Sequence, residues 1–269
     1  MILYVGDLHG SVAATVNLDA LAIELGATAV VQVGDMGLRW QPDALGRFFD
    51  KRGRQAKKLN ARRKMIRWYT AGGNHENWAR WKAAEIKTEG PLVELAPEVF
   101  YVKRGSLIVI NGLRHAFCGG AESSDKHLRT PGKTWWPEET PSRAEFELFF
   151  DSVDAGVDVV VTHDAPKETG TFRHADRGDR PTCQTLSRVI ELSSKRPGIW
   201  AFGHHHNHER VDVSDVRGIT TYLGCGLEGQ GWLLDGSRLE KIESVKVELI
   251  GKAETKKPGM KHHELQARP

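Results

Sequence analysis

The sequence predicts an α/β (α+β) fold in which two β-sheets lie inside and helices lie outside. In both halves of the 269-residue chain, short apolar runs of strand length alternate with longer segments of helical periodicity. The middle of the chain is instead rich in strand-like runs, and Asn111-Gly112 between two of them is a strong type I′ hairpin signal. Two βα-rich halves around a β-rich middle fit two packed sheets that are covered by helices.

The N-terminal part contains three short apolar runs, each followed by a segment of helical character. We expect strands over residues 2–6, 28–33 and 65–70 and helices over 12–25, 43–64 and 77–86. Gly26 follows the first helical segment and is typical of the position that ends a helix. The second helical segment is basic over residues 51–64, which indicates either a solvated helix face or a surface for a nucleic-acid backbone.

Beyond Pro97 the expected elements are mostly strands. We expect strands over 99–102, 106–110 and 113–118, and then an irregular segment over 119–142 that is rich in Gly, Ser, Pro and Trp. A helix over 142–153, a strand over 157–162, a loop over 164–181, a helix over 182–195 and strands over 199–202, 209–213, 218–223, 231–234 and 238–249 complete the pattern. We interpret residues 1–250 as one domain and the polar residues 251–269 as a disordered tail.

Composition narrows the class of protein. The formal net charge of +3 neither requires nor excludes a nucleic-acid partner. No apolar run approaches the roughly 20 residues that a membrane helix needs, so we expect no membrane partner. The three cysteines are far apart and form no CxxC, and the first expected strand begins next to Met1 and leaves no room for a signal peptide. We therefore expect a cytoplasmic protein, and the sequence has no signal for or against an oligomer.

Side chains that can bind a metal ion recur just after the expected strands. The stretches are "GDLHG", "GDMG", "GGNHE", "THDAP" and "GHHH". Ligands of open α/β sheets gather beyond the carboxyl ends of the strands, and five such strand ends in one chain exceed what turn-forming residues alone explain. The candidate metal ligands are Asp7, His9, Asp35, Asn74, His163, His204 and His206.

The donor types indicate the kind of metal. Carboxylate, amide oxygen and imidazole without a thiolate suit Mn²⁺, Fe or Zn²⁺ in a catalytic site better than a structural zinc cage. Seven donors exceed one tetrahedral site and suffice for two ions if one carboxylate bridges them. We expect two divalent metal ions, with Mn²⁺ as the first candidate and Fe, Zn²⁺, Ni²⁺ or Co²⁺ as the others.

The ordered set of motifs resembles the calcineurin-like metallophosphoesterases over residues 6–206. The segment 119–139 further resembles one in small bacterial and phage members of this group. The resemblance implies a four-layer αββα sandwich, with two mixed central sheets, flanking helices and a dimetal site at the C-terminal strand ends. It implies one metal held by Asp7, His9, Asp35 and His206, and a second held by Asp35, Asn74, His163 and His204, with Asp35 bridging. His75 matches a family histidine that contacts the phosphate and is a candidate proton donor to the leaving group.

Three further residues are candidates for substrate contact: Arg39, Asp125 and Arg129. Arg39 follows "GDMG" but lacks the Asp-Arg-Gly or Asn-Arg-Gly triplet of the protein Ser/Thr phosphatases and dinucleoside tetraphosphatases, which argues against both subfamilies. Asp125 and Arg129 lie in the segment 119–139 with Trp135-Trp136. This segment is either a flap, in which Lys or Arg contacts phosphate and Trp stacks on a base, or a surface loop anchored by its tryptophans.

These observations predict a phosphodiesterase that hydrolyses small phosphodiesters, such as 2′,3′-cyclic nucleotides, by attack of a hydroxide that bridges the two metals. The expected partner is a small phosphoester or nucleotide substrate. The alternatives are a nuclease or nucleic-acid-end processing enzyme, a phosphomonoesterase, and a non-catalytic scaffold.

The run "GHHH" contains two predicted ligands and one histidine between them. If the run is extended, His205 points away from the neighbouring ligands and is either solvated or packed behind them. Alanine at His204 or His206 is then expected to remove metal and activity, and alanine at His205 to have a much smaller effect.

Overall fold

The computed structural model describes residues 1–59, 65–170 and 180–243. One sheet consists of β1 (Ile2–Val5), β2 (Ala29–Gln32), β3 (Arg67–Thr70), β4 (Leu92–Ala96), β5 (Val99–Val102), β12 (Gly231–Asp235) and β13 (Arg238–Ile242). The other consists of β6 (Leu107–Ile110), β7 (Leu113–Cys118), β8 (Val159–Thr162), β9 (Ile199–Phe202), β10 (Glu209–Asp215) and β11 (Gly218–Gly224). The α-helices are α1 (Val12–Glu24), α2 (Ala44–Lys58), α3 (Trp78–Glu85), α4 (Arg143–Asp154) and α5 (Pro181–Leu192).

Both sheets are mixed. The first has the strand order β13-β12-β1-β2-β3-β5-β4, and the second has the order β10-β11-β9-β8-β7-β6. In the first, β1, β2, β3 and β5 are parallel and β12, β13 and β4 are antiparallel to their neighbours. In the second, β7, β8, β9 and β11 are parallel, with β6 and β10 antiparallel at the edges. The central strands of both sheets therefore direct their carboxyl ends to one edge.

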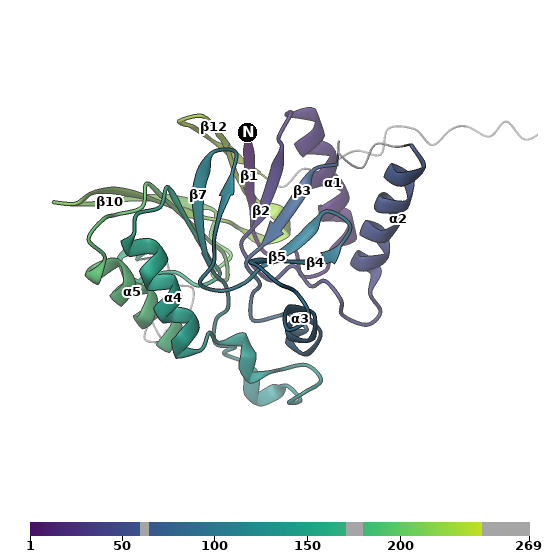
Figure 1. The fold of residues 1–269 in the computed structure, drawn as a ribbon, viewed down its shortest axis with the longest axis horizontal. Coiled ribbons are helices and arrows are strands. Elements are labelled where there is room, and N and C mark those ends of the chain that lie inside the picture. Colours follow the sequence, from purple (N-terminus) through teal and green to yellow (C-terminus); the bar gives the residue numbers. More distant parts are fainter. Residues whose placement is uncertain (60–64, 171–179, 244–269) are drawn as a thin grey trace, which may run out of the picture.

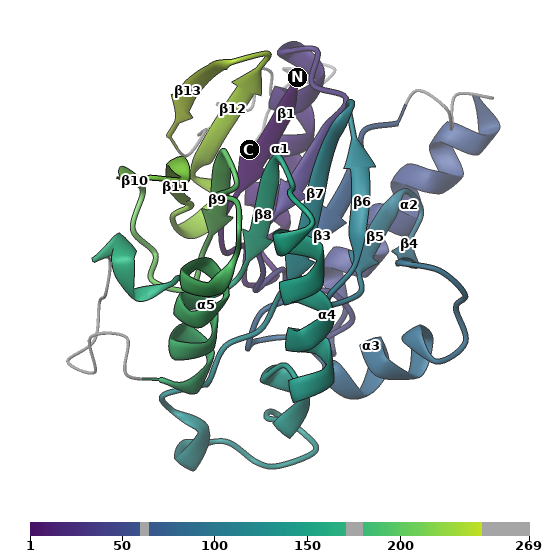
Figure 2. The ribbon, with the colours of Figure 1, turned by 60° about the vertical axis from the view of Figure 1, so that its left-hand side comes forward.

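The chain forms four layers, as expected. Helices α1, α2 and α3 cover the outer face of the first sheet, and α4 and α5 cover the outer face of the second (Figures 1 and 2). Each of the three interfaces has its own apolar core. Residues alternate between cores along a strand: Leu3 and Val5 of β1 pack with the helices, whereas Ile2 and Tyr4 pack between the sheets. Central strands such as β1, β2 and β8 are thus buried on both faces, which explains their largely apolar sequences.

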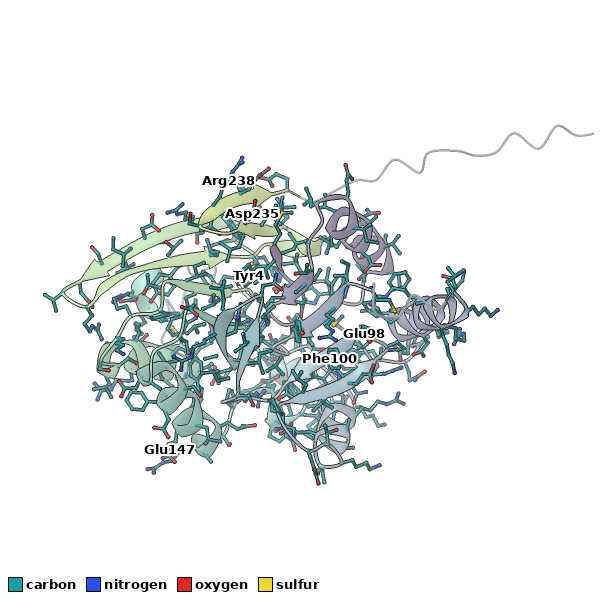
Figure 3. The ribbon with its side chains drawn as sticks, turned by 45° about the horizontal axis from the view of Figure 1, so that its top comes forward. Tyr4, Glu98, Phe100, Glu147, Asp235 and Arg238 are labelled. Atoms are coloured by element: carbon teal, nitrogen blue, oxygen red, sulfur yellow. The ribbon has the colours of Figure 1, made fainter. Side chains whose placement is uncertain are left out.

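One polar pair lies inside the sandwich. The hydroxyl of Tyr4 on β1 is 2.8 Å from Nε2 of His115 on β7, and both side chains are fully buried. Figure 3 shows Tyr4 in the interior, in contrast to Glu147, Asp235 and Arg238 at the periphery. The pair links the two sheets by a hydrogen bond and satisfies groups that burial would otherwise leave without water.

Local signals account for the start of four of the α-helices in the described residues and for the end of α1. Ser11, Asp43 and Asn77 each accept a backbone N–H in the first turn of α1, α2 and α3, and Ser142 with Glu145 forms a capping box at α4. Gly26 follows α1 with a φ of 66°, in the left-handed region that a glycine adopts without strain.

Several expectations need correction or lie outside the described residues. Strand β4 was not predicted, because its sequence "LVELA" contains Glu94 among apolar residues. Glu94 and Ala96, which both have low strand propensity, also flank a shift in the register between β4 and β5. The expected helix over 43–64 ends at Lys58, and residues 60–64 lie outside the described chain. Much of the expected loop over 164–181, the end of the expected strand over 238–249 and the expected tail over 251–269 also lie outside it.

Membrane-spanning helices were searched for among the described residues, and none of the helices there has the length and apolar character to cross a bilayer.

Candidate metal centre

The candidate ligands converge at the edge to which the parallel strands of both sheets point. Asp7 and His9 follow β1, Asp35 follows β2, and Asn74 follows β3 of the first sheet. The second sheet supplies His163 after β8 and the pair His204 and His206 after β9. The site is therefore built by both sheets, and its formation depends on their packing.

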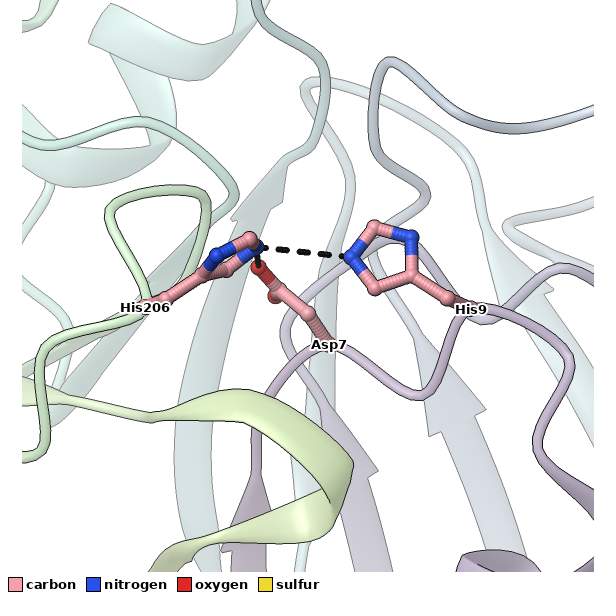
Figure 4. A group of neighbouring side chains, drawn as sticks. All are labelled: Asp7, His9 and His206. Atoms are coloured by element: carbon pink, nitrogen blue, oxygen red, sulfur yellow. Dashed lines mark hydrogen bonds and ion pairs between the residues drawn. The ribbon is translucent and has the colours of Figure 1, made fainter.

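One group consists of Asp7, His9 and His206, whose potential ligand atoms all lie within 4.8 Å of one another. Figure 4 shows the two imidazole rings turned toward the same carboxylate. Nε2 of His206 is 3.0 Å from Oδ2 of Asp7 and 3.4 Å from Nε2 of His9. Two ring nitrogens that face each other beside a carboxylate form an arrangement suited to a shared cation.

A second group lies deeper. Nε2 of His163 is 3.3 Å from Oδ2 of Asp35 and 3.0 Å from Oδ1 of Asn74, and Nδ1 of His204 is 3.1 Å from the same amide oxygen. Nδ1 of His163 is 3.1 Å from the carbonyl oxygen of Val33, and since a carbonyl only accepts, this nitrogen donates its hydrogen. The lone pair on Nε2 of a neutral His163 thus faces two oxygen atoms that also carry lone pairs. A metal ion would bind all three atoms and so remove the repulsion between them.

The donor set fits divalent metal ions. Among the described residues, Oδ1 of Asp7 is buried and has no hydrogen-bond partner, although it lies 3.9 Å from Nδ1 of His163. The potential ligand atoms of Asp7, Asp35 and His163 also lie within 4.8 Å of one another. Carboxylates therefore lie close to the histidines of both groups. A buried carboxylate oxygen without a donor is costly unless a cation meets it.

The charges of this site are strongly coupled. Burial alone would raise the pKa of Asp35, but the ring of His163, followed by His75 and His9, holds that pKa well below its ordinary value. Burial alone would lower the pKa of His163, but Asp35 and then Asp7 raise it. The carboxylates therefore create a field that holds positive charge at the centre of the site.

The backbone is in an uncommon conformation at four of the candidate ligands. The φ angles are 45° at His9, 55° at Asp35, 63° at His204 and 56° at His206. Residues with a Cβ adopt this left-handed region rarely and at a cost, and such positions concentrate at functional sites.

Comparisons with known proteins give the family of the chain. The model of the calcineurin-like phosphoesterases matches residues 1–208, most of the chain. The chain belongs to this family. Members use a dinuclear centre of divalent metal ions and hydrolyse phosphoester bonds, and the Asp and His groups described above could hold such ions. None of the curated proteins matches the chain in sequence.

Solved structures support the same fold. One aligns with 91% of this chain and 98% of its own at 14% identity, with a TM-score of 0.58. The crystal structure of TT1561 of Thermus thermophilus aligns over the same shares at 16% identity, with a TM-score of 0.55. The phosphopantetheinyl hydrolase PptH of Mycobacterium tuberculosis is more distant, with 14% identity over 84% of this chain and 89% of its own and a TM-score of 0.42. At these identities, the first two likenesses show the fold alone.

Two glycines that precede candidate ligands leave room for neighbouring side chains. A Cβ on Gly73 would lie 2.2 Å from Oδ1 of Asp35, and a Cβ on Gly203 would lie 2.4 Å from Oδ1 of Asp7. Glycine is therefore needed before these ligands because side chains from adjacent strand ends occupy the space, and not only because the chain turns there.

The run 203–206 is a bend and not an extended strand, which corrects the sequence interpretation. His204 and His206 have left-handed backbones, so the two rings face the site for a different reason than strand alternation. His205 does point elsewhere, but it is 1% exposed and not solvated. Its Nε2 is 2.9 Å from Oδ1 of Asp164, which in turn lies 3.7 Å from Nη2 of Arg180.

His75 lies at the open side of the site. Its backbone N–H donates to Oδ1 of Asp35 at 2.7 Å, and its ring centroid is 5.1 Å from that of His9. Nη2 of Arg129 lies 2.8 Å from Nε2 of His75, and Asp125 pairs with the same guanidinium at 2.8 Å. Burial lowers the pKa of His75, and Arg129 lowers it further, whereas Asp35 acts in the opposite direction. Arg129 is therefore within reach of an anion bound beside His75.

Arg39, a candidate for substrate contact, binds to neighbouring parts of the chain. Its Nε donates to the carbonyl of Leu95 at 2.9 Å, Nη2 contacts the same oxygen, and Nη1 donates to Asp43 at 3.1 Å. These contacts tie the loop after β2 to β4 and to the start of α2. Arg39 thus anchors a loop, and we do not include it among the substrate contacts.

Sequence reasoning missed two residues that orient Asn74. Nδ2 of Asn74 donates to Oγ of Ser123 at 3.0 Å, and that hydroxyl donates to Oε2 of Glu139 at 2.6 Å. The backbone N–H of Ser123 donates to Oε1 of Glu139 at 2.7 Å, and both side chains are buried. The amide oxygen of Asn74 is thereby turned toward His163 and His204. A Ser and a Glu in an irregular segment give no sequence signal for this role.

Glu76, next to His75, supports the loop after β2. Its carboxylate accepts the backbone N–H of Met36 at 2.7 Å and that of Gly37 at 3.2 Å. Burial, followed by the charge of Asp35, raises the pKa of Glu76 to about 8, against the effect of these two donors. Glu76 therefore holds the loop that carries Asp35.

The segment 119–139 is anchored at its base and meets the site at Arg129. Trp136 is 8% exposed, and its ring centroid lies 5.4 Å from that of Trp40. Trp135 is partly exposed, but its Nε1 is buried. Trp136 therefore anchors the segment, as the surface-loop interpretation expects, and Arg129 extends from it to the ring of His75.

Proposed function

We propose that this protein is a metal-dependent phosphodiesterase that acts on small phosphodiesters, with 2′,3′-cyclic nucleotides as a candidate class. The observation that carries the proposal is the convergence of seven oxygen and imidazole donors from both sheets, with His75 at the open side of the group. The membership in a family of phosphoesterases supports the reaction type. The preference for diesters is our inference.

In this proposal two ions share the site. Asp7, His9, Asp35 and His206 would hold one, and Asp35, Asn74, His163 and His204 would hold the other, with Asp35 common to both. Mn²⁺ is the proposed ion because the donors are carboxylate, amide oxygen and imidazole. When bound, the ions would supply an activated water and neutralise charge on the phosphoryl oxygens.

The protein's own residues bind the phosphate and move a proton. His75 donates a proton to the oxygen of the leaving group, which is the usual task of a positioned imidazole. Arg129, 2.8 Å from this ring, binds a non-bridging phosphoryl oxygen, since guanidinium is suited to phosphate. Asp125 holds Arg129 in place through its ion pair.

Space at the site supports a diester. Two pockets flank His9, one of about 410 Å³ and one of about 400 Å³. A phosphodiester bound at the metal centre has two substituents that must extend away from it, whereas a phosphomonoester has one. Pockets on two sides of the same ligand therefore favour the diester.

The test is hydrolysis of bis-p-nitrophenyl phosphate by the metal-free protein after addition of Mn²⁺. We expect turnover in the wild type and a loss of about a hundredfold or more in His75→Ala, since general acid catalysis contributes about 10²–10⁴-fold. Asn74→Ala is expected to lose activity together with bound metal. His127→Ala, which changes an exposed histidine of the segment 119–139, is the matched control and should retain activity. An inactive wild type, or full activity in His75→Ala and Asn74→Ala, contradicts the proposal.

The alternatives give different patterns in the same assay. A nuclease would hydrolyse single-stranded DNA or RNA faster than cyclic mononucleotides, and it would use the exposed basic side chains of α2, such as Lys51, Arg54 and Lys57. A phosphomonoesterase would prefer p-nitrophenyl phosphate. A scaffold would bind no metal and show no turnover.

A further inference from the structure

The two pockets beside His9 differ in chemistry. The first, which we call the Trp40 pocket, is lined by His9, His75, Trp40, Pro42, Ala44 and Leu45. The second, which we call the Glu228 pocket, is lined by Asp7, His9, Ser11, Leu227, Glu228 and Gln230. His9 is shared, whereas His75 contributes to the Trp40 pocket alone. Because the proposed proton donor faces one pocket, the two pockets have different roles in the reaction.

The indole of Trp40 is held in place beside His75. Its Nε1 donates to the backbone carbonyl of His75 at 2.8 Å. Its ring packs at 60° against the buried ring of Trp136, with 5.4 Å between centroids. The aromatic wall of the pocket is therefore ordered before a substrate arrives, which favours binding of a planar group.

The walls of the Trp40 pocket carry no formal charge apart from that of a protonated histidine. Among the described residues that line it there is no Lys, Arg, Asp or Glu, and the nearby Arg39 is bound to Leu95 and Asp43. The described lining of the Glu228 pocket contains two carboxylates and no Lys or Arg. A second phosphate would thus find no Lys or Arg partner in the described walls of either pocket, which disfavours nucleoside polyphosphates and their diesters.

We propose that the Trp40 pocket binds the leaving group of a linear phosphodiester, that this group bears an uncharged planar ring, and that the substituent retained on phosphorus lies in the Glu228 pocket. The proposal rests on the proposed phosphodiesterase function. Water adds to phosphorus, the ester bond to the ring-bearing oxygen breaks, and that oxygen takes the proton of His75. One proton of the water stays on the new phosphomonoester, and the other is released and restores the protonated His75. The products are a neutral alcohol or phenol and a phosphomonoester. A cyclic nucleotide, which has both ester oxygens on one ribose, cannot place separate groups in the two pockets. Within the small phosphodiesters of the proposed function, this inference therefore selects linear diesters over the cyclic class.

The experiment compares two substrates with the same leaving group, methyl p-nitrophenyl phosphate and thymidine 5′-p-nitrophenyl phosphate, in the Mn²⁺-loaded protein. Trp40→Ala is expected to lower kcat/KM about tenfold, and by a similar factor for the two substrates. Both carry the p-nitrophenyl leaving group, and the lost contact is with this group. Trp40→Phe keeps an aromatic wall and should stay within about threefold of the wild type. Gln230→Ala is expected to lower kcat/KM for the thymidine ester alone.

Three outcomes overturn the assignment. In the first, Trp40→Ala affects the thymidine ester but not the methyl ester, which would mean that the retained substituent and not the leaving group lies in the Trp40 pocket. In the second, Trp40→Ala equals the matched control Trp135→Ala, a tryptophan outside both pockets, so the ring has no role. In the third, 2′,3′-cyclic AMP is hydrolysed faster than the thymidine ester. In each case the wild type still turns over the p-nitrophenyl diesters, whereas a wild type inactive on all of them contradicts the proposed function itself.

Discussion

At the residue scale, backbone strain is concentrated at the candidate metal ligands. The non-glycine residues with positive φ in the described chain are His9, Asp35, Arg39, Glu98, Asn111, His204, His206 and Glu228. Half of them are candidate ligands, and Arg39 and Glu228 lie in the adjoining loops. Each such residue costs about 1–2 kcal/mol. The fold therefore gives up stability to direct these side chains, as expected where function and not packing determines the residue.

This strain can be measured at His206. Both His206→Ala and His206→Gly remove the imidazole and are expected to reduce bound metal. Because glycine adopts a φ of 56° without strain and alanine does not, the glycine variant should be about 1 kcal/mol more stable than the alanine variant in the absence of metal. Urea unfolding monitored by tryptophan fluorescence gives the difference. Equal stabilities would show that the backbone at this position is not strained.

The neighbouring His205 is expected to affect stability and not metal binding. Its ring is buried against Asp164, so His205→Ala leaves a buried carboxylate short of a donor and should cost about 1.5–3 kcal/mol. His204→Ala and His206→Ala should instead lower the metal content. Metal analysis together with thermal unfolding separates the two effects. Loss of metal in His205→Ala equal to that in His204→Ala contradicts this division.

The pair Ser123 and Glu139 is expected to set the affinity for metal through Asn74. Ser123→Ala removes the acceptor of the Asn74 amide and should weaken Mn²⁺ binding about 10–100-fold, as changes behind metal ligands commonly do. Isothermal titration calorimetry of the metal-free protein measures this directly. Ser123→Thr keeps the hydroxyl and should recover part of the affinity, which a merely structural defect would not do. Ser124→Ala, at an exposed neighbouring position, is the control.

The sequence reveals ligands more readily than their supports. Asp7, Asn74 and His163 stand out because a metal-competent side chain follows an apolar run in each case. Ser123 and Glu139 are recognised only once the chain is folded, since they are 16 residues apart and meet through a hydroxyl. Arg39 is the opposite case: its place after "GDMG" suggested phosphate contact, and its contacts with Leu95 and Asp43 were not visible in the sequence.

At the element scale, the apolar strands were predictable and the backbone of the loops was not. The mostly buried strands are rich in aliphatic and aromatic residues, and the expected strands over 99–102, 113–118 and 199–202 coincide with β5, β7 and β9. Strand β4 was missed because it lies at the edge of its sheet, where fewer apolar residues are required. The bend at 203–206 was assigned as extended because positive φ is not expected of histidine.

Close contact between strand-end loops makes a prediction for Gly119, the residue after β7. A Cβ at this position would lie 1.8 Å from the carbonyl oxygen of Ala71, in the loop after β3 of the other sheet. Gly119→Ala should therefore force the two loops apart and cost about 1–3 kcal/mol, a typical cost of overpacking. Thermal unfolding checks this. Gly132→Ala is not a suitable control because its φ is positive, so we choose Gly198→Ala, where the nearest atom to a new Cβ is 3.5 Å away. Equal stability of the two variants contradicts the prediction.

At the scale of the whole molecule, the two sheets share an apolar core and a set of metal ligands. The core between them contains Tyr4 and Val31 of one sheet with Val159 and Val161 of the other. The candidate ligands continue this interface at its polar edge, where Asp35 of the first sheet lies 3.3 Å from His163 of the second. Bound ions would therefore connect the sheets as well as activate water.

It follows that metal should stabilise the entire fold. At a free Mn²⁺ concentration a hundredfold above the dissociation constant, each of two sites adds about 2.7 kcal/mol, which corresponds to a rise in Tm of about 10–20 °C for a chain of this length. Differential scanning calorimetry with and without chelator measures the rise. Because each ion needs ligands from both sheets, Asn74→Ala and His163→Ala should each reduce it, although they change different sheets. A rise that persists in both variants would place the metal elsewhere, and no rise in the wild type would mean that the ligands converge without binding an ion.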